Sequence, residues 1–162
     1  MMPNSFPRAA TAGRERGFTM VEALVALVIL AIGLLGIAAL YLDSLRGGRT
    51  ALYRTTAVAL ASDLADRIRS NREAGTAYAL DFGDDTMTAD TTCDATPGCA
   101  PATMAETDLA RWRERIVQML PAGDAEVTAT AIAGEPTRYV ITVRWIEPGT
   151  DGPIDFILSM QT

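Results

Sequence analysis

Residues 18–42 read FTMVEALVALVILAIGLLGIAALYL, and this apolar stretch decides the fold of the chain. Glu22 is its only charged residue. Residues 23–42 supply 20 uncharged, mostly apolar positions. As a helix they span about 30 Å, the thickness of the hydrocarbon core of a membrane. The stretch is therefore predicted to form one transmembrane helix over residues 18–42.

Glu22 lies near the start of this predicted helix, where a charge needs an explanation. A carboxylate costs about 2.5–3.5 kcal/mol at the bilayer centre on insertion scales, and less near an interface. Carboxylates inside membranes therefore usually have a function and a partner. An uncleaved signal anchor would explain the apolar run and its orientation, but it leaves Glu22 unexplained.

The segment ahead of the helix is short and basic. Residues 1–17 contain three arginines and one glutamate, a net charge of +2. Positive residues flanking the first membrane segment stay in the cytoplasm, so residues 43–162 are expected on the exported side. An ordinary secretory signal has a shorter apolar region that is followed by its cleavage site. Here we expect residues 1–17 to be a leader that is removed in front of the apolar run.

Composition excludes several classes of function for the remainder. Beyond Gly17 the chain has 11 arginines and 19 acidic residues, a net charge of −8, so nucleic acid is not expected as a partner. The chain has no histidine, which removes the usual general base and the commonest zinc ligand. Two cysteines alone cannot complete a four-ligand zinc site, and no phosphate-binding glycine motif occurs. We expect no enzyme, no metal and no cofactor.

The two cysteines, Cys93 and Cys99, lie in the loop sequence CDATPGC. In an oxidising compartment we expect them to form a disulfide, with a free thiol pair as the alternative. The Pro97-Gly98 dipeptide favours a turn that brings the two ends of this loop together. In the chain-entropy model, closing seven residues contributes about 2.4 kcal/mol to stability.

The exported part, residues 43–162, is expected to form one small domain. A helix is predicted over residues 43–73, because Tyr53, Ala57, Leu60, Leu64 and Ile68 form one apolar stripe. Residues 76–104 read as a loop, and a second helix is predicted over 108–120, capped by Thr107 or Asp108. Alternation of apolar residues then predicts an antiparallel sheet over 125–162, with strands near 126–132, 138–145 and 154–160. The fold class is therefore α+β, with a long N-terminal helix packed on a small sheet.

Five aspartates fall in the predicted loop between residues 81 and 94. Clustered carboxylates can bind calcium, but their spacing does not match the EF-hand pattern. A solvated acidic loop is the better interpretation.

The segment RGFTMVE, residues 16–22, resembles the prepilin processing site of type IV pilins and type II secretion pseudopilins. The resemblance rests on a short basic leader, Gly17, Phe18, the acidic Glu22 and the apolar helix that follows. It implies cleavage between Gly17 and Phe18 by a prepilin peptidase, followed by N-methylation of the Phe18 amine. It also implies a salt bridge in which Glu22 pairs with an N-terminal amine in the assembled filament. An amine of the same chain is also within reach, since Phe18 and Glu22 are four residues apart.

Residues 59–72 and the run AIGLLG at 31–36 are similar to minor pilins of the PilV type. This resemblance implies a type IV pilin-like fold and a low-abundance subunit that helps to prime pilus assembly. Its expected partners are other minor and major pilins, the prepilin peptidase, the inner membrane and the pilus assembly platform. It implies an inner-membrane subunit with a periplasmic domain that later enters the filament, with adhesion and twitching motility as indirect outcomes. The alternatives are a minor pseudopilin of a type II secretion system and an anchored periplasmic domain that never polymerises.

Overall fold

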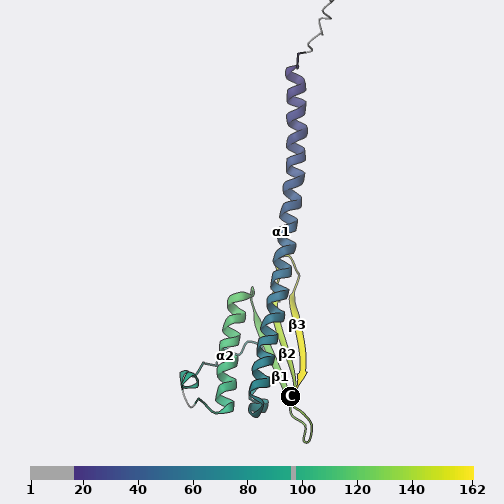
Figure 1. Ribbon diagram of the computed structural model, residues 1–162. Helices are drawn as coiled ribbons and strands as arrows, with labels where there is room; N and C mark the ends of the chain where they lie inside the picture. The colour runs from purple at the N-terminus through teal and green to yellow at the C-terminus, as the bar shows by residue number, and fades with distance from the viewer. Residues whose placement is uncertain (1–16, 96–97) are drawn as a thin grey trace, which may run out of the picture. The chain divides into compact units, whose positions relative to one another are not determined.

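The computed structural model describes residues 17–95 and 98–162 (Figure 1). The predicted leader therefore lies outside the described residues, except for Gly17. The chain divides into two compact units, residues 1–44 and residues 45–162. We call the described part of the first unit, residues 17–44, the N-terminal segment, and the second unit, residues 45–162, the head.

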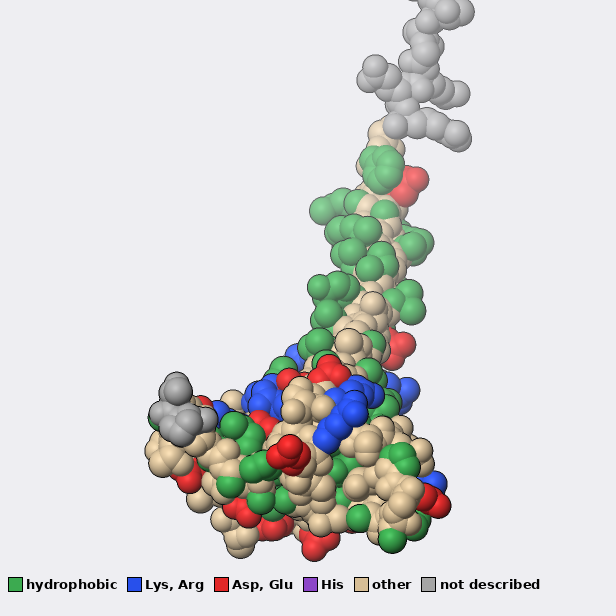
Figure 2. Space-filling view, turned by 60° about the horizontal axis from the view of Figure 1, so that its bottom comes forward, with side chains coloured by type: hydrophobic (Ala, Val, Ile, Leu, Met, Phe, Trp, Pro, Cys, Tyr) green, Lys and Arg blue, Asp and Glu red, His purple; other side chains and the backbone are tan. Residues whose placement is uncertain are grey.

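The N-terminal segment consists mainly of the first part of helix α1 (Met20–Ser70). Its residues are exposed along its whole length, and hydrophobic side chains make up most of its visible surface (Figure 2). An 18-residue window in α1 has a mean hydropathy of 2.9, enough in length and composition to cross a membrane. The helix begins at Met20 rather than at residue 18, because Thr19 caps it.

In the head, α1 buries the apolar stripe that its sequence predicts, except for Tyr53, which is partly buried. Four positions of the stripe lie on one face of the helix and are all buried: Ala57, Leu60, Leu64 and Ile68. The helix ends at Ser70, three residues before the predicted end. A 3₁₀ helix, η1 (Arg72–Tyr78), follows it and contains a glycine at a φ of 52°. Tighter 3₁₀ turns at this end redirect the chain towards the sheet.

The sheet has three antiparallel strands in the order β1 (Asp124–Thr130), β2 (Arg138–Ile146) and β3 (Pro153–Gln161). The alternation predicted for β2 is confirmed, since its inward side chains are buried: Tyr139, Ile141, Val143 and Trp145. The first strand lies two residues earlier than predicted. It ends at Thr130 because the chain then enters the hairpin turn, in which Gly134 has a φ of 82°.

Helix α2 (Pro101–Met119) begins seven residues before the predicted start at Asp108, which corrects that boundary. Pro101 occupies the first turn, where a missing amide proton costs nothing, so the polar sequence that follows is helical rather than loop. The predicted loop over 76–104 therefore contains the start of α2, a β-bridge from Leu80 to Val127, and the short 3₁₀ helix η2 (Thr91–Asp94). Thr107 and Asp108, predicted as caps, lie inside α2 and are buried.

In the head, α1 and α2 lie beside the three strands (Figure 1), and one hydrophobic core joins these elements. Trp112 of α2 is fully buried, and its indole Nε1–H donates to the carbonyl oxygen of Leu60 in α1 at 2.8 Å. Trp145 of β2 is also buried in this core. Both tryptophans of the chain therefore report on the folding of the head.

Candidate functional site

The predicted cleavage site lies directly in front of α1. Gly17 and Phe18 have no regular secondary structure, and both are exposed. A Cβ atom added at Gly17 would meet nothing within 4 Å among the described residues. The peptide bond that joins these two residues is therefore accessible to a second protein.

Thr19 sets the start of the helix and was missed in the sequence analysis. Its hydroxyl oxygen accepts a hydrogen bond from the amide N–H of Glu22 at 3.2 Å, and its carbonyl accepts from Ala23 at 3.2 Å. This is the N-terminal half of a capping box, in which Ser or Thr precedes Glu by three residues. The sequence signal was present as Thr19-Met20-Val21-Glu22 ahead of an apolar run.

Glu22 occupies the third position of α1, in the first helical turn. The unpaired amide groups and the dipole of a helix N-terminus favour an anion there. Among residues 17–95 and 98–162, Glu22 takes part in none of the side-chain ion pairs. Its carboxylate is exposed and is available to a cation from outside the described chain.

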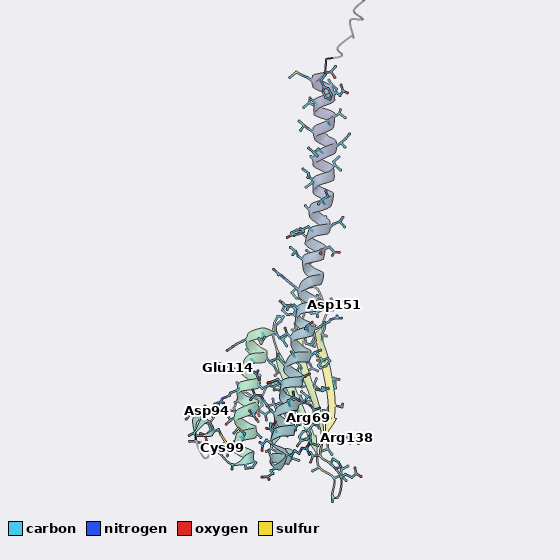
Figure 3. The ribbon with its side chains drawn as sticks, in the orientation of Figure 1. Arg69, Asp94, Cys99, Glu114, Arg138 and Asp151 are labelled. Carbon is cyan, nitrogen blue, oxygen red and sulfur yellow. A yellow bond between two sulfur atoms is a disulfide. The ribbon has the colours of Figure 1, made fainter. Side chains whose placement is uncertain are left out.

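The two cysteines form a disulfide in the structure, with an S–S distance of 2.05 Å. Its loop is docked onto α2 from both sides of Cys93. The amide of Asp90 donates to the Thr107 hydroxyl at 3.1 Å, and Arg111 donates to Asp94 at 2.6 Å. This hydrogen bond from Arg111 lowers the pKa of the Asp94 carboxyl. Figure 3 shows Asp94 and Cys99 together beside α2.

Replacing Cys93 by serine is expected to destabilise the head by about 2 kcal/mol, because the closed loop restricts the unfolded chain. Urea titration of tryptophan fluorescence measures this loss. Cys99→Ser and the double variant serve as matched controls and should show the same loss. A reductant should lower the wild type to the level of these variants and leave the variants unchanged. An unchanged midpoint in Cys93→Ser would contradict a stabilising bridge.

The acidic loop uses several of its carboxylates locally. Asp84 accepts hydrogen bonds from the amide and the hydroxyl of Thr86, at 2.9 and 2.7 Å. Asp90 caps η2 by accepting from the amide of Thr92 at 2.8 Å. In the part of the chain that the structure describes, no group of three or more Asp, Glu, Cys or His side chains is placed to hold a metal ion.

A polar network joins α1, η1 and α2, and sequence reasoning did not anticipate it. Asp108 is buried in α2, and one of its oxygens accepts from Arg67 of α1 at 2.6 Å. Its other oxygen accepts from the Tyr78 hydroxyl of η1 at 2.9 Å. Burial raises the pKa of Tyr78, so its hydroxyl stays protonated and keeps donating. Asp63 of α1 extends the network by pairing with both Arg67 and Arg115.

A shallow groove of about 480 Å³ lies beside this network and is lined by both helices and by Cys99. Its charged groups already have partners within the head. Asp66 pairs with Arg69 at 2.7 Å, and Asp63 and Asp108 belong to the network. The groove therefore presents paired charges, and the ion pairs Asp108–Arg67 and Asp63–Arg115 join α1 to α2.

The Asp63 pair predicts a pH dependence. Burial alone would raise the pKa of Asp63, but hydrogen bonds from Arg115 and Arg67 outweigh it and hold the pKa below its ordinary value of 3.8. A carboxyl with a lowered pKa stabilises the fold above its ordinary value, and this contribution is lost as the pH falls through the lower folded value. The urea concentration at the midpoint of unfolding should therefore decrease as the pH is lowered below about 4. The decrease should be smaller in Asp63→Asn. Identical pH profiles for the two proteins would contradict this assignment.

Two family models match the chain. A model described as the prokaryotic N-terminal methylation motif matches residues 13–38, which include Gly17, Phe18 and Glu22. A model described as type IV pilin Tt1218 matches residues 39–110, from the N-terminal segment into α2. No curated protein and no solved structure matches the chain.

The two matches adjoin in sequence and agree with the fold. A long N-terminal helix followed by a small three-stranded antiparallel sheet is the type IV pilin-like α+β fold, so the predicted fold class is confirmed. Residues 111–162, which include the whole sheet, lie outside both matches. The similarity is therefore concentrated in the helices and the N-terminal motif.

Proposed function

We propose that this chain is a minor pilin of a type IV pilus. The reason is that a match to a type IV pilin model directly follows a match to an N-terminal methylation motif. The two matches support a pilin or pseudopilin subunit, which is a structural rather than an enzymatic role. The observation that carries the proposal is the N-terminal segment itself. An exposed Gly17-Phe18 junction stands ahead of a capped, apolar helix that bears one acidic residue.

The first proposed step is removal of the leader by a prepilin peptidase. Hydrolysis of the amide between Gly17 and Phe18 leaves a carboxylate on the leader and a new α-amine on Phe18. That amine, once it has lost a proton, attacks the methyl carbon of a sulfonium donor, and the donor leaves as a thioether. The absence of neighbouring described atoms around Gly17 supports access by the peptidase.

In the second step, Glu22 pairs with an N-terminal amine during assembly. An α-amine has a reference pKa of about 7.7–8.0, so it is largely cationic at neutral pH. We propose that the amine belongs to a neighbouring subunit, because one such pair per subunit would set the register between stacked helices. An exposed Glu22 without an ion pair among the described residues supports this role.

We further propose a PilV-type role, in which the chain joins other minor and major pilins to prime assembly. Before assembly the chain would reside in the inner membrane, with the head in the periplasm and residues 18–42 across the bilayer. The pilus assembly platform would then draw it into the filament. The length and hydropathy of α1 support membrane anchoring.

Mass spectrometry of the protein purified from its own cells tests the proposal. The expected mass begins at Phe18 and includes one added methyl group. The variant Gly17→Val should retain the leader, whereas Gly33→Ala should be processed normally. A Cβ added at either site meets no described atom within 4 Å, so the comparison tests recognition at the cleavage site. An intact leader on the wild-type protein would refute the pilin function, and co-purification with secretion pseudopilins would assign it to that system instead.

A further inference from the structure

One edge of the sheet of the head is partly covered, and the other edge is open. On the β1 side, Leu80 and Val127 exchange two backbone hydrogen bonds, at 3.0 and 2.8 Å. On the β3 side, no strand within residues 17–95 and 98–162 pairs with the outer edge. Natural proteins protect such an edge with proline, lysine, a bulge or a covering segment. After Pro153, β3 has only one charged residue, Asp155, and no further proline.

The inward face of β3 is also incompletely covered. Ile154, Phe156 and Leu158 pack against the core but remain half-buried. Their partners on β2 are Trp145, Val143 and Ile141, which are all buried. Burial therefore falls off towards the open edge. A further strand beside β3 would bury this apolar row as well as satisfy the backbone groups of the edge.

A row of charges across the outer face of the sheet indicates which charge one residue of that strand should carry. Asp124 on β1, Arg144 on β2 and Asp155 on β3 lie in register, so acid, base and acid alternate across the sheet. Arg144 donates two hydrogen bonds to Asp155, each at 2.7 Å. The next position beyond Asp155 is therefore best filled by a basic side chain. β3 itself contains no basic residue, so a second copy of β3 cannot supply this group.

We propose that the open edge of β3 accepts a β-strand from a partner protein of different sequence. The strand runs antiparallel to β3, as β2 does on the other side, with apolar residues on the inner face and a basic residue opposite Asp155. This inference rests on the head alone. A failure of leader processing or filament incorporation would not contradict this inference. Absence of strand docking would not contradict the proposed function.

The test uses the full chain in detergent and a synthetic peptide with the sequence of residues 137–147, TRYVITVRWIE. This sequence contains β2, which pairs with β3 in the required antiparallel register. Of its two arginines, Arg144 lies opposite Asp155. A cysteine replaces the valine at position 140 of the peptide. In β2 this valine lies opposite both Ser159 of β3 and Thr128 of β1.

Two exposed hydroxyl residues of one row provide a matched pair of protein variants, Ser159→Cys and Thr128→Cys. Docking at the open edge should trap the peptide as a disulfide with Ser159→Cys and not with Thr128→Cys. Equal trapping by both variants would show that the peptide replaces β2, and this would overturn the proposal. The proposal would also be overturned if Ser159→Cys trapped no peptide. The same holds if this variant formed a disulfide with a second copy of the protein in place of the peptide.

A second peptide tests the charge in the proposed strand. Changing the arginine opposite Asp155 to glutamate should lower the rate of trapping by Ser159→Cys at least about threefold, since like charges face each other across the strands. Equal rates of trapping for the two peptides would overturn the claim that the docked strand carries a basic residue opposite Asp155. Tryptophan fluorescence confirms that both protein variants are folded before the comparison.

Discussion

Replacing Glu22 with alanine is expected to leave the chain in the membrane but to lower its incorporation into filaments about tenfold or more. A hydrogen bond to a charged group contributes about 1.5–3 kcal/mol, and 1.4 kcal/mol corresponds to a factor of ten. The apolar run that supports insertion is unchanged by the substitution. Membrane fractionation and immunoblots of sheared filaments measure the two quantities separately.

Glu22→Gln separates the two roles that the N-terminal segment allows for this residue. Glutamine can still take part in a capping box with Thr19, but it has no charge with which to bind an amine. If pairing with an amine is the role, Glu22→Gln should lose incorporation as Glu22→Ala does, and Thr19→Ala should keep most of it. Normal incorporation of Glu22→Gln with loss in Thr19→Ala would assign Glu22 to capping instead.

The features that sequence predicted correctly are those with a local period. The apolar run in α1, its buried stripe ending at Ile68 and the alternation in β2 each repeat over several turns or residue pairs. Their secondary structure follows from geometry that neighbouring residues share, so a single sequence suffices. The resemblance to pilins lies in the same part of the chain, and the matched family models end before the sheet.

The features that sequence missed depend on contacts between distant segments. The start of α2 is polar, and nothing in its periodicity distinguishes it from the acidic loop before it. Thr107 and Asp108 looked like helix caps because their side chains commonly serve that purpose. In the fold these side chains instead bond Asp90 and Arg67, the latter 41 residues away. The open edge of β3 likewise becomes visible only when strand order is known.

Asp108 gives the largest expected loss of stability outside the apolar core. Asp108→Ala should destabilise the head by about 2–4 kcal/mol, because it removes one partner from a buried polar network. The buried Tyr78 hydroxyl then loses its acceptor, and Arg67 keeps only its contact with Asp63. The midpoint of urea unfolding, followed by the fluorescence of the two buried tryptophans, reports this change without interference from the membrane segment.

A matched substitution on α1 shows whether burial is the cause. Asp66 also pairs with an arginine, Arg69, but its side chain is 76% exposed. Asp66→Ala should therefore change stability by no more than about 0.5 kcal/mol. Combining Asp108→Ala with Tyr78→Phe should cost less than the sum of the two single losses, since each removes the same hydrogen bond. The network would not join the helices as a unit if the losses of stability in Asp108→Ala and Tyr78→Phe were additive. Equal losses of stability in Asp108→Ala and Asp66→Ala would lead to the same conclusion.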